Sequence, residues 1–250
     1  QTRDGIYIEV SHGENLIRGN RFRHLRYGIH YMYSHGNEVA DNRTQATRAG
    51  YALMQSSDLE VHGNRSEGDL EYGILLNYLT YSRLRGNRVI DVGGGPGYRR
   101  TGKDGKALFV FNSQGNEIRD NLFGHSDMGI HLTAGSEGNV IAGNAFIDNR
   151  VQVKYVATRQ QEWSEGGRGN YWSDYLGWDL DADGVGDRPY EPNDNVDLIL
   201  WKYPMAKVLM HSPAVQTLRW VQQQFPVLKA RGVRDSHPLM RPPAPLKSQP

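Results

Sequence analysis

The chain has 250 residues, 29 basic and 28 acidic side chains, no cysteine, and a hydrophobic fraction of 38%. The near balance of charges argues against electrostatic recognition of nucleic acids, and the apolar content argues against a disordered chain. The lack of cysteine excludes disulfides, zinc fingers, iron–sulfur clusters and a cysteine nucleophile.

The N-terminus reads QTRDGIYIEV, with neither an initiating Met nor the apolar core of a signal peptide. These residues already belong to a pattern that recurs further along, so we expect an N-terminal part to be missing. No apolar run approaches the roughly 18 residues that a transmembrane helix requires. We therefore expect no membrane-spanning helix.

Gly-Asn or Asp-Asn pairs recur beside aliphatic residues. Their asparagines are separated by 22, 22, 23, 34 and 23 residues, which indicates one repeat with one insertion. Two apolar columns, two residues apart, keep the same step, as a short strand with one inward face requires. The asparagines are Asn20, Asn42, Asn64, Asn87, Asn121 and Asn144; the columns are Ile6, Ile29, Tyr51, Ile74 and Ile130, and Ile8, Tyr31, Leu53, Leu76 and Leu132.

A period in the low twenties is typical of a solenoid whose units cannot bury their apolar face alone. The Leu-x-x-Leu-x-Leu spacing of leucine-rich repeats is missing. The pattern instead predicts an all-β, right-handed parallel β-helix over residues 1–156, with three short strands in each rung. Gly and Asn tolerate the left-handed backbone of a sharp corner, and stacked asparagines can hydrogen-bond to their copies. We interpret the asparagine column as structural.

The long step comes from DVGGGPGYRRTGKDGK, residues 91–106, which we expect to leave the solenoid as a loop. Gly97, Gly102 and Lys103 nearly match a phosphate-binding loop. However, Asp104 stands where that loop needs Ser or Thr, and a carboxylate would repel phosphate. Nucleotide binding is therefore disfavoured.

Residues 157–204 lose the period and gather aromatic side chains, as expected of a cap over an open solenoid end. The predicted packing residues of this cap are Tyr171, Trp172, Tyr175 and Trp178.

An acidic loop lies within the cap and follows Asp-x-Asp-x-Asp-Gly-x-x-Asp. Alternate carboxylates in a tight turn can converge on a hard cation, so we expect a structural calcium site; a hydrogen-bonded turn without metal is the alternative. Position 12 of the loop is Tyr190 rather than an acid, unlike the helix-flanked version. The expected ligands are Asp179, Asp181, Asp183 and Asp187.

Residues 205–250 change character again. Ser212 and Pro213 can begin a helix whose apolar stripe ends at Pro226. The stripe consists of Val215, Leu218, Val221 and Phe225. The remaining tail is rich in proline and basic residues, so we expect it to be extended. It either packs on the protein's own surface or serves as an interaction segment for a partner.

Nine His and six Met in a chain without cysteine suggest copper, because imidazole and thioether are its remaining soft and borderline ligands. His30, Met32 and His35 form one group, in which Met32 would lie beside an inward strand position. We expect His30 and His131 to point outward from one sheet, several rungs apart and too far to share an ion. The candidate copper ligands are His125, Met128, His131, Met210, His211, His237 and Met240.

An enzyme of the polysaccharide lyase or epimerase type is the alternative function. Acid–base chemistry in a β-helix groove needs converging carboxylates. The positions expected to line the sheet are mostly apolar or imidazole, which disfavours an enzyme. They are Tyr7, His30, Ala52, Leu75 and His131.

The rungs of Gly-Ile-x-Leu, Asn-x-Ile and Gly-Asn-x-Phe resemble the carbohydrate-binding and sugar-hydrolase β-helix family. Within it, GNYWSDYLGWDLDADGVGDRPY and the segment from VDLILWKYPMAKVLM to RDSHPLMRPP resemble the C-terminal part of the NosD family, whose N-terminal rungs are absent here. The resemblance covers the whole chain, and its C-terminal hundred residues are the most specific.

This resemblance implies a non-enzymatic, periplasmic accessory role in assembling the copper site of nitrous oxide reductase, NosZ. The implied partners are the ABC transporter subunits NosF and NosY, with the chaperone NosL as copper donor and no nucleic acid. Copper would be a transient cargo, and the helix and basic tail would dock on the transporter. A periplasmic copper handler that uses His and Met avoids thiol oxidation.

Overall fold

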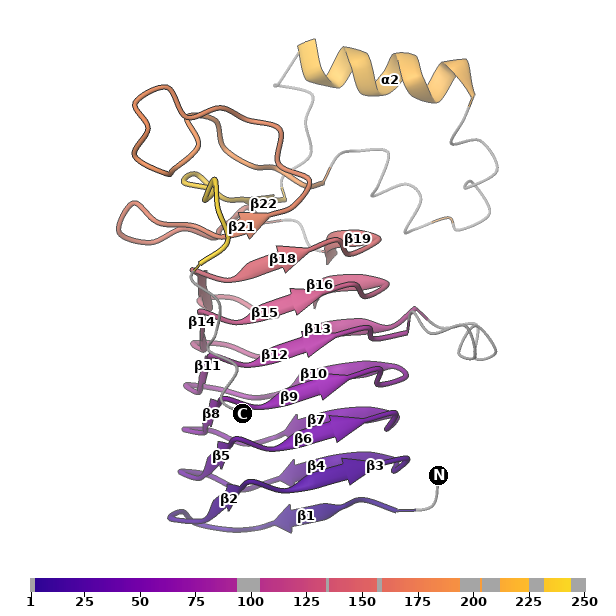
Figure 1. Ribbon diagram of the computed structural model, residues 1–250, viewed down its shortest axis with the longest axis vertical. Coiled ribbons are helices and arrows are strands. Elements are labelled where there is room, and N and C mark those ends of the chain that lie inside the picture. Colours follow the sequence, from indigo (N-terminus) through magenta and orange to yellow (C-terminus); the bar gives the residue numbers. More distant parts are fainter. Residues whose placement is uncertain are drawn as a thin grey trace.

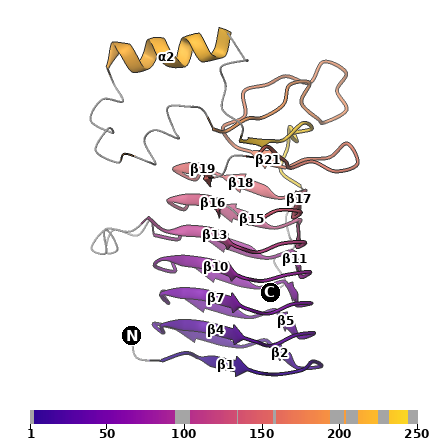
Figure 2. The same cartoon turned by 180° about the vertical axis from the view of Figure 1, so that it is seen from behind.

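Three stacks of parallel strands build the molecule. A computed structural model describes residues 3–93, 104–133, 135–156, 159–193, 203, 212–224 and 232–243. Successive turns of the chain each add one strand to sheets A, B and C, and equivalent strands pair in parallel (Figure 1). Figure 2 shows the same stack of rungs from behind. This β-solenoid of about seven turns confirms the predicted fold class.

The strands of the rungs are short, and those of sheet A are the longest. Sheet A contains β1 (Ile6–Glu9), β4 (Tyr27–Met32), β7 (Ala49–Met54), β10 (Tyr72–Asn77), β13 (Lys106–Phe111), β16 (Met128–Thr133) and β19 (Val151–Val156). Sheet B contains β2 (Leu16–Arg18), β5 (Glu38–Ala40), β8 (Glu60–His62), β11 (Arg83–Arg85), β14 (Glu117–Arg119) and β17 (Val140–Ala142). Sheet C contains β3 (Arg21–Arg23), β6 (Arg43–Gln45), β9 (Arg65–Glu67), β12 (Arg88–Ile90), β15 (Leu122–Gly124), β18 (Ala145–Ile147) and β21 (Tyr171–Trp172).

The inward side chains of the three sheets form one continuous core. Ile29 and Tyr31 of β4 are fully buried and lie in register with Tyr51 and Leu53 of β7. Equivalent residues of each rung therefore stack directly above one another, which confirms the two apolar columns. Because no rung can bury this face alone, the stability of each rung depends on its neighbours.

The repeated asparagines form a continuous hydrogen-bonded ladder inside the solenoid. Oδ1 of Asn87 accepts from both the backbone N–H and the side-chain Nδ2 of Asn64, each at 3.0 Å. Nδ2 of Asn87 donates in turn to Oδ1 of Asn121 and to the carbonyl of Val61. Every polar atom of Asn87 named here is thus satisfied without water, as burial requires. The same step repeats from Asn20 as far as Asn170, one rung beyond the predicted set.

The corner beside this ladder has a left-handed backbone, but not at the asparagines. Positive φ occurs at the residue before each asparagine of the predicted set, and that residue is Gly or Asp. The sequence suggested that either Gly or Asn takes the left-handed conformation at the corner. In the structure the residue before Asn takes that conformation, and the Asn side chain hydrogen-bonds successive rungs to one another. The residues concerned are Gly19, Asp41, Gly63, Gly86, Asp120 and Gly143.

The insertion at residues 91–106 does not disturb the stack. Tyr72 of β10 pairs directly with Lys106 at the start of β13, so the register continues across the long step. Gly97, Gly102 and Lys103 lie outside the described residues, and the structure says nothing of the near match to a phosphate loop.

An aromatic cap covers the last rung. The ring of Trp172 in β21 stacks on Phe146 at 4.4 Å and on Tyr190 at 4.6 Å, and Tyr175 meets Tyr190 edge-on. Trp172 is therefore a packing residue, as predicted. Trp178, by contrast, is 43% exposed, with the Arg188 guanidinium over its ring.

Part of the C-terminal tail returns to this end of the solenoid. Strand β22 (Val233–Arg234) pairs with β20 (Gln161–Glu162). The buried carboxylate of Asp235 occupies the next place in the asparagine ladder. Its Oδ2 accepts from the backbone N–H of Asn170 at 2.7 Å and from Nε1 of Trp172 at 2.8 Å. Of the two alternatives for the tail, this segment packs on the protein's own surface; residues 244–250 lie outside the described residues.

Helix α2 (Pro213–Gln224) lies beyond the last rung (Figure 1). It begins as the sequence predicts, because the carbonyl of Ser212 accepts from the N–H groups of Val215 and Gln216. Phe225 and Pro226 lie outside the described residues. Among the described residues, no helix combines the length and apolar character needed to span a bilayer.

Candidate functional site

The outward side chains of sheet A form the candidate site. The register places one residue of each rung in a single row on this face, which we call the outer column, and it confirms the predicted outward positions of His30 and His131. No member of the column is a carboxylate, so it lacks the paired acids that an acid–base enzyme needs. The outer column consists of Tyr7, His30, Ala52, Leu75, Phe109, His131 and Lys154.

His30 is almost fully buried near the N-terminal end of this face. Its ring stacks on Tyr7 at 4.6 Å and meets Tyr27 edge-on at 4.9 Å. Nδ1 of His30 lies 2.9 Å from Oδ2 of Asp4, while Nε2 is buried and has no hydrogen-bond partner. The carboxylate therefore fixes the orientation of the ring and leaves one nitrogen uncommitted.

Arg26 holds Asp4 in place through two hydrogen bonds, from Nε at 2.8 Å and from Nη2 at 2.7 Å. Partial burial alone would raise the pKa of Asp4, but the hydrogen bonds and charges of Arg26 and His30 lower that pKa overall. Asp4 is thus an anion, and the three side chains form a relay from guanidinium to carboxylate to imidazole.

His131 occupies the same column near the opposite end. Its ring centroid lies 4.9 Å from that of Phe109, and its Nδ1 is buried without a partner. Burial, together with the positive charges of Lys154 and Lys106, lowers the pKa of His131 to about 3. The imidazole is therefore neutral at ordinary pH, but two ammonium groups oppose a cation beside it.

The other histidine and methionine candidates are scattered. Met128, at the start of β16, is buried, and His125 is exposed at a corner with positive φ. His237 is exposed, and its Nδ1 lies 3.0 Å from Oγ of Ser164. The N–H of Met240 donates to the Gly184 carbonyl. Met210 and His211 lie outside the described residues, so the copper assignment of this set stays a prediction.

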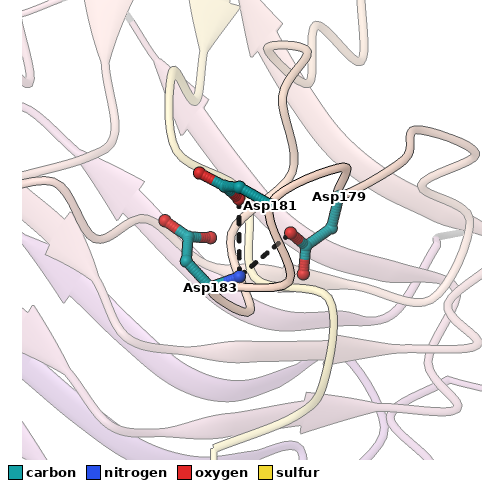
Figure 3. A group of neighbouring side chains, drawn as sticks. All are labelled: Asp179, Asp181 and Asp183. Carbon is teal, nitrogen blue, oxygen red and sulfur yellow. Dashed lines mark hydrogen bonds between the residues drawn. The ribbon is translucent and has the colours of Figure 1, made fainter.

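The acidic loop brings three of its four predicted calcium ligands together (Figure 3). Carboxylate oxygens of Asp179, Asp181 and Asp183 lie within 4.8 Å of one another. Asp187 is outside this group, and its Oδ2 accepts from the backbone N–H of Leu180 at 2.8 Å. The N–H of Asp183 contacts both other carboxylates, at 3.1 Å and 3.4 Å. These bonds match the alternative of a hydrogen-bonded turn, and calcium stays a prediction.

Sequence reasoning missed the partners of His30. Asp4 and Arg26 are 22 residues apart, which is one rung, so the repeat period could have placed them side by side. Reasoning from the sequence treated each histidine together with its nearest methionines along the chain. In a solenoid, the nearest neighbours of an outward side chain lie one period away.

The sequence model of the family described as periplasmic copper-binding protein (NosD) matches residues 1–177. The chain belongs to the NosD family. The matched part of this NosD-family chain includes the outer column and ends inside the cap, before the acidic loop. The resemblance predicted from the rungs and the cap is confirmed.

Two curated NosD relatives carry the name "Probable ABC transporter binding protein NosD". The protein of Stutzerimonas stutzeri is 61% identical over 196 residues, which are 77% of this chain and 45% of that protein. The protein of Pseudomonas aeruginosa is 62% identical over 192 residues, 76% of this chain and again 45% of its own length. The NosD-family chain spans a little under half the length of these relatives.

A weaker similarity leads to an enzyme. The 3-dehydroshikimate dehydratase of Acinetobacter baylyi is 33% identical over 79 residues, which are 31% of this NosD-family chain and 16% of the dehydratase. A match over so small a share of the dehydratase gives this chain no role of that enzyme.

Proposed function

We propose that this chain is part of a periplasmic accessory protein that handles copper, or docks its carriers, during maturation of the copper site of nitrous oxide reductase. Membership of the NosD family is the observation that supports this role, because the matching family is described as periplasmic and copper-binding. The outer column adds imidazole without paired carboxylates, which suits metal handling better than sugar chemistry.

The proposed partners follow from the same membership. The relatives are named as binding proteins of an ABC transporter, and we propose NosF and NosY as that transporter, NosL as copper donor and NosZ as the recipient. Helix α2 is the proposed docking segment for the transporter, because the described part of the tail packs on the cap. The exposed side chain of Trp220 on α2, 59% accessible, gives a partner an aromatic anchor.

The test is made in cells that respire nitrous oxide. The reductase is purified from strains with and without the gene for the complete protein, and its copper is measured by mass spectrometry. We expect copper-deficient, inactive reductase in the deletion strain and recovery on complementation. Fully loaded reductase in the deletion strain would contradict the proposal. Release of unsaturated sugars from uronate polymers by the purified protein would favour the lyase alternative.

A further inference from the structure

We propose that His30, Met32 and Met54 form a binding site for a single Cu(I) ion on the outer face of sheet A. The inference rests on the proposed copper-handling function and assigns it a place. It uses one imidazole nitrogen and two thioether sulfurs, the ligand types that select Cu(I).

The imidazole of His30 is already arranged as a ligand. Because Nδ1 donates to Asp4, the neutral ring carries its lone pair on Nε2, and Nε2 is the buried atom without a partner. A metal-binding histidine almost always donates its other N–H to a carboxylate or carbonyl, which fixes the tautomer and makes the ligating nitrogen more basic. The relay from Arg26 through Asp4 supplies this arrangement.

A neighbouring histidine shows the opposite tautomer and is a natural control. Nδ1 of His35 accepts the backbone N–H of Ser57 at 3.1 Å, so the proton of the neutral ring is on Nε2. Nε2 of His35 is therefore a hydrogen-bond donor and offers no lone pair to a metal ion. The structure thus distinguishes two histidines that are five residues apart in the sequence.

Two thioethers lie on the same face as His30. Met32 and Met54 pair in register on β4 and β7 and point outward, since Tyr31 and Leu53 between the outward positions are fully buried. Adjacent strands are about 4.8 Å apart, so the two side chains are neighbours. Both are half-buried, and methionine side chains are flexible enough to converge on one ion.

Tyr7 joins the imidazole to the thioethers. Its ring stacks on His30, and its hydroxyl lies 3.7 Å from Sδ of Met32. The two ligand types therefore share one neighbouring side chain. The charge of Asp4 beside the ring favours a cation there, in contrast to the lysines beside His131.

The test is an anaerobic titration of the 250-residue chain with Cu(I) against the chromophoric chelator bathocuproine disulfonate. The variants His30→Ala, Met32→Leu and Met54→Leu are compared with the matched controls His35→Ala and Met128→Leu. We expect each of the first three to lower Cu(I) affinity at least ten-fold and the two controls to change it less than two-fold. Circular dichroism melts show whether each variant is folded.

A second readout needs no variant. Long-range ¹H–¹⁵N spectra of the wild-type imidazoles identify Nδ1–H of His30, and its Nε2 resonance is expected to shift on addition of one equivalent of Cu(I). Two outcomes would show that the site is wrong while the proposed function stands. In the first, wild type binds Cu(I), but the Nε2 resonance of His30 does not shift and His30→Ala keeps the affinity. In the second, the affinity is lost when His237 or His131 is replaced instead. If wild type binds no Cu(I), the site fails together with the proposal that this chain carries copper.

Discussion

His30 and His131 occupy the same column of the same sheet, yet their surroundings have opposite charge. His30 faces the carboxylate of Asp4, while the positive charges of Lys154 and Lys106 act on His131 more strongly than the negative charge of Asp104. Both rings lie against an aromatic side chain and both have one buried nitrogen without a partner. The backbone position is shared, so the difference comes entirely from the side chains one or two rungs away.

This contrast teaches that an outward position in a solenoid has no fixed chemistry. Each rung contacts only its neighbours, so a substitution changes the local environment without altering the register elsewhere. The N-terminal end of sheet A is suited to a cation and the other end to an uncharged or anionic group. Three predictions break or sharpen this comparison.

The largest effect is expected from Asp4, because it is hydrogen-bonded to Nδ1 of His30 whereas Nδ1 of His131 has no hydrogen-bond partner. Asp4→Ala removes the acceptor that fixes the tautomer of His30, and we expect Cu(I) affinity to fall about 100-fold, the upper range for loss of such a partner. Asp4→Asn keeps an acceptor but removes the charge, and a loss of about ten-fold is expected. The chelator titration measures both. Equal affinity in the two variants and wild type would show that the carboxylate does not prepare the imidazole.

A smaller effect on stability is expected from His131 in acid. The unfolded chain protonates this residue near pH 6.5, whereas the folded chain keeps it neutral down to about pH 3. Its contribution is therefore fully present above about pH 6.5 and is lost as the pH falls toward 3. At pH ~4.5, about two units below the unfolded pKa, the loss of unfolding free energy is about 3 kcal/mol.

The measurement is urea unfolding of wild type and His131→Gln at neutral pH and at pH ~4.5. Glutamine does not titrate in this range, so we expect the variant to lose about 3 kcal/mol less on acidification. His125→Gln, at an exposed corner, is the matched control and should follow wild type. An unchanged acid dependence in His131→Gln would mean that the folded protein tolerates the charged ring.

The smallest effect is expected from Lys154, whose charge helps to disfavour the protonated form of His131. Lys154→Gln should raise the pKa of His131 by roughly half a unit to one unit, because one of two nearby positive charges is removed while burial remains. Titration followed by imidazole NMR measures this shift. A pKa that stays at about 3 would show that the charge of Lys154 does not contribute, and that burial and Lys106 hold the ring neutral.

The fold was predictable because the asparagine of each rung performs the same structural task. Its spacing gave the period, and the aliphatic pairs beside it gave the inward face, so the outward placement of His30 and His131 followed without coordinates. The left-handed corner was harder to assign, because Gly, Asp and Asn all tolerate positive φ and the pair offers two positions.

The surroundings of the outward side chains were less predictable. The repeat places Asp4 one rung below the strand of His30, but only coordinates show that Nδ1 faces that carboxylate and that Arg26 holds it. Contacts without a period were beyond reach. Asp235 meets Asn170 across 65 residues, and nothing in the sequence marks that aspartate as different from the other acids of the cap and tail.

The contact of Asp235 with the last asparagine gives the stack a direction. Along the ladder each Nδ2 donates to Oδ1 of the next asparagine toward the C-terminal end, and for the final one, Asn170, Oδ2 of Asp235 takes the place of that acceptor. Leu239 pairs with Tyr171 of the last strand in sheet C, where a further rung would otherwise add. Exposed ends of β-structures invite polymerisation. The returning segment thus occupies part of the open edge of sheet C, where a strand from another molecule would otherwise pair.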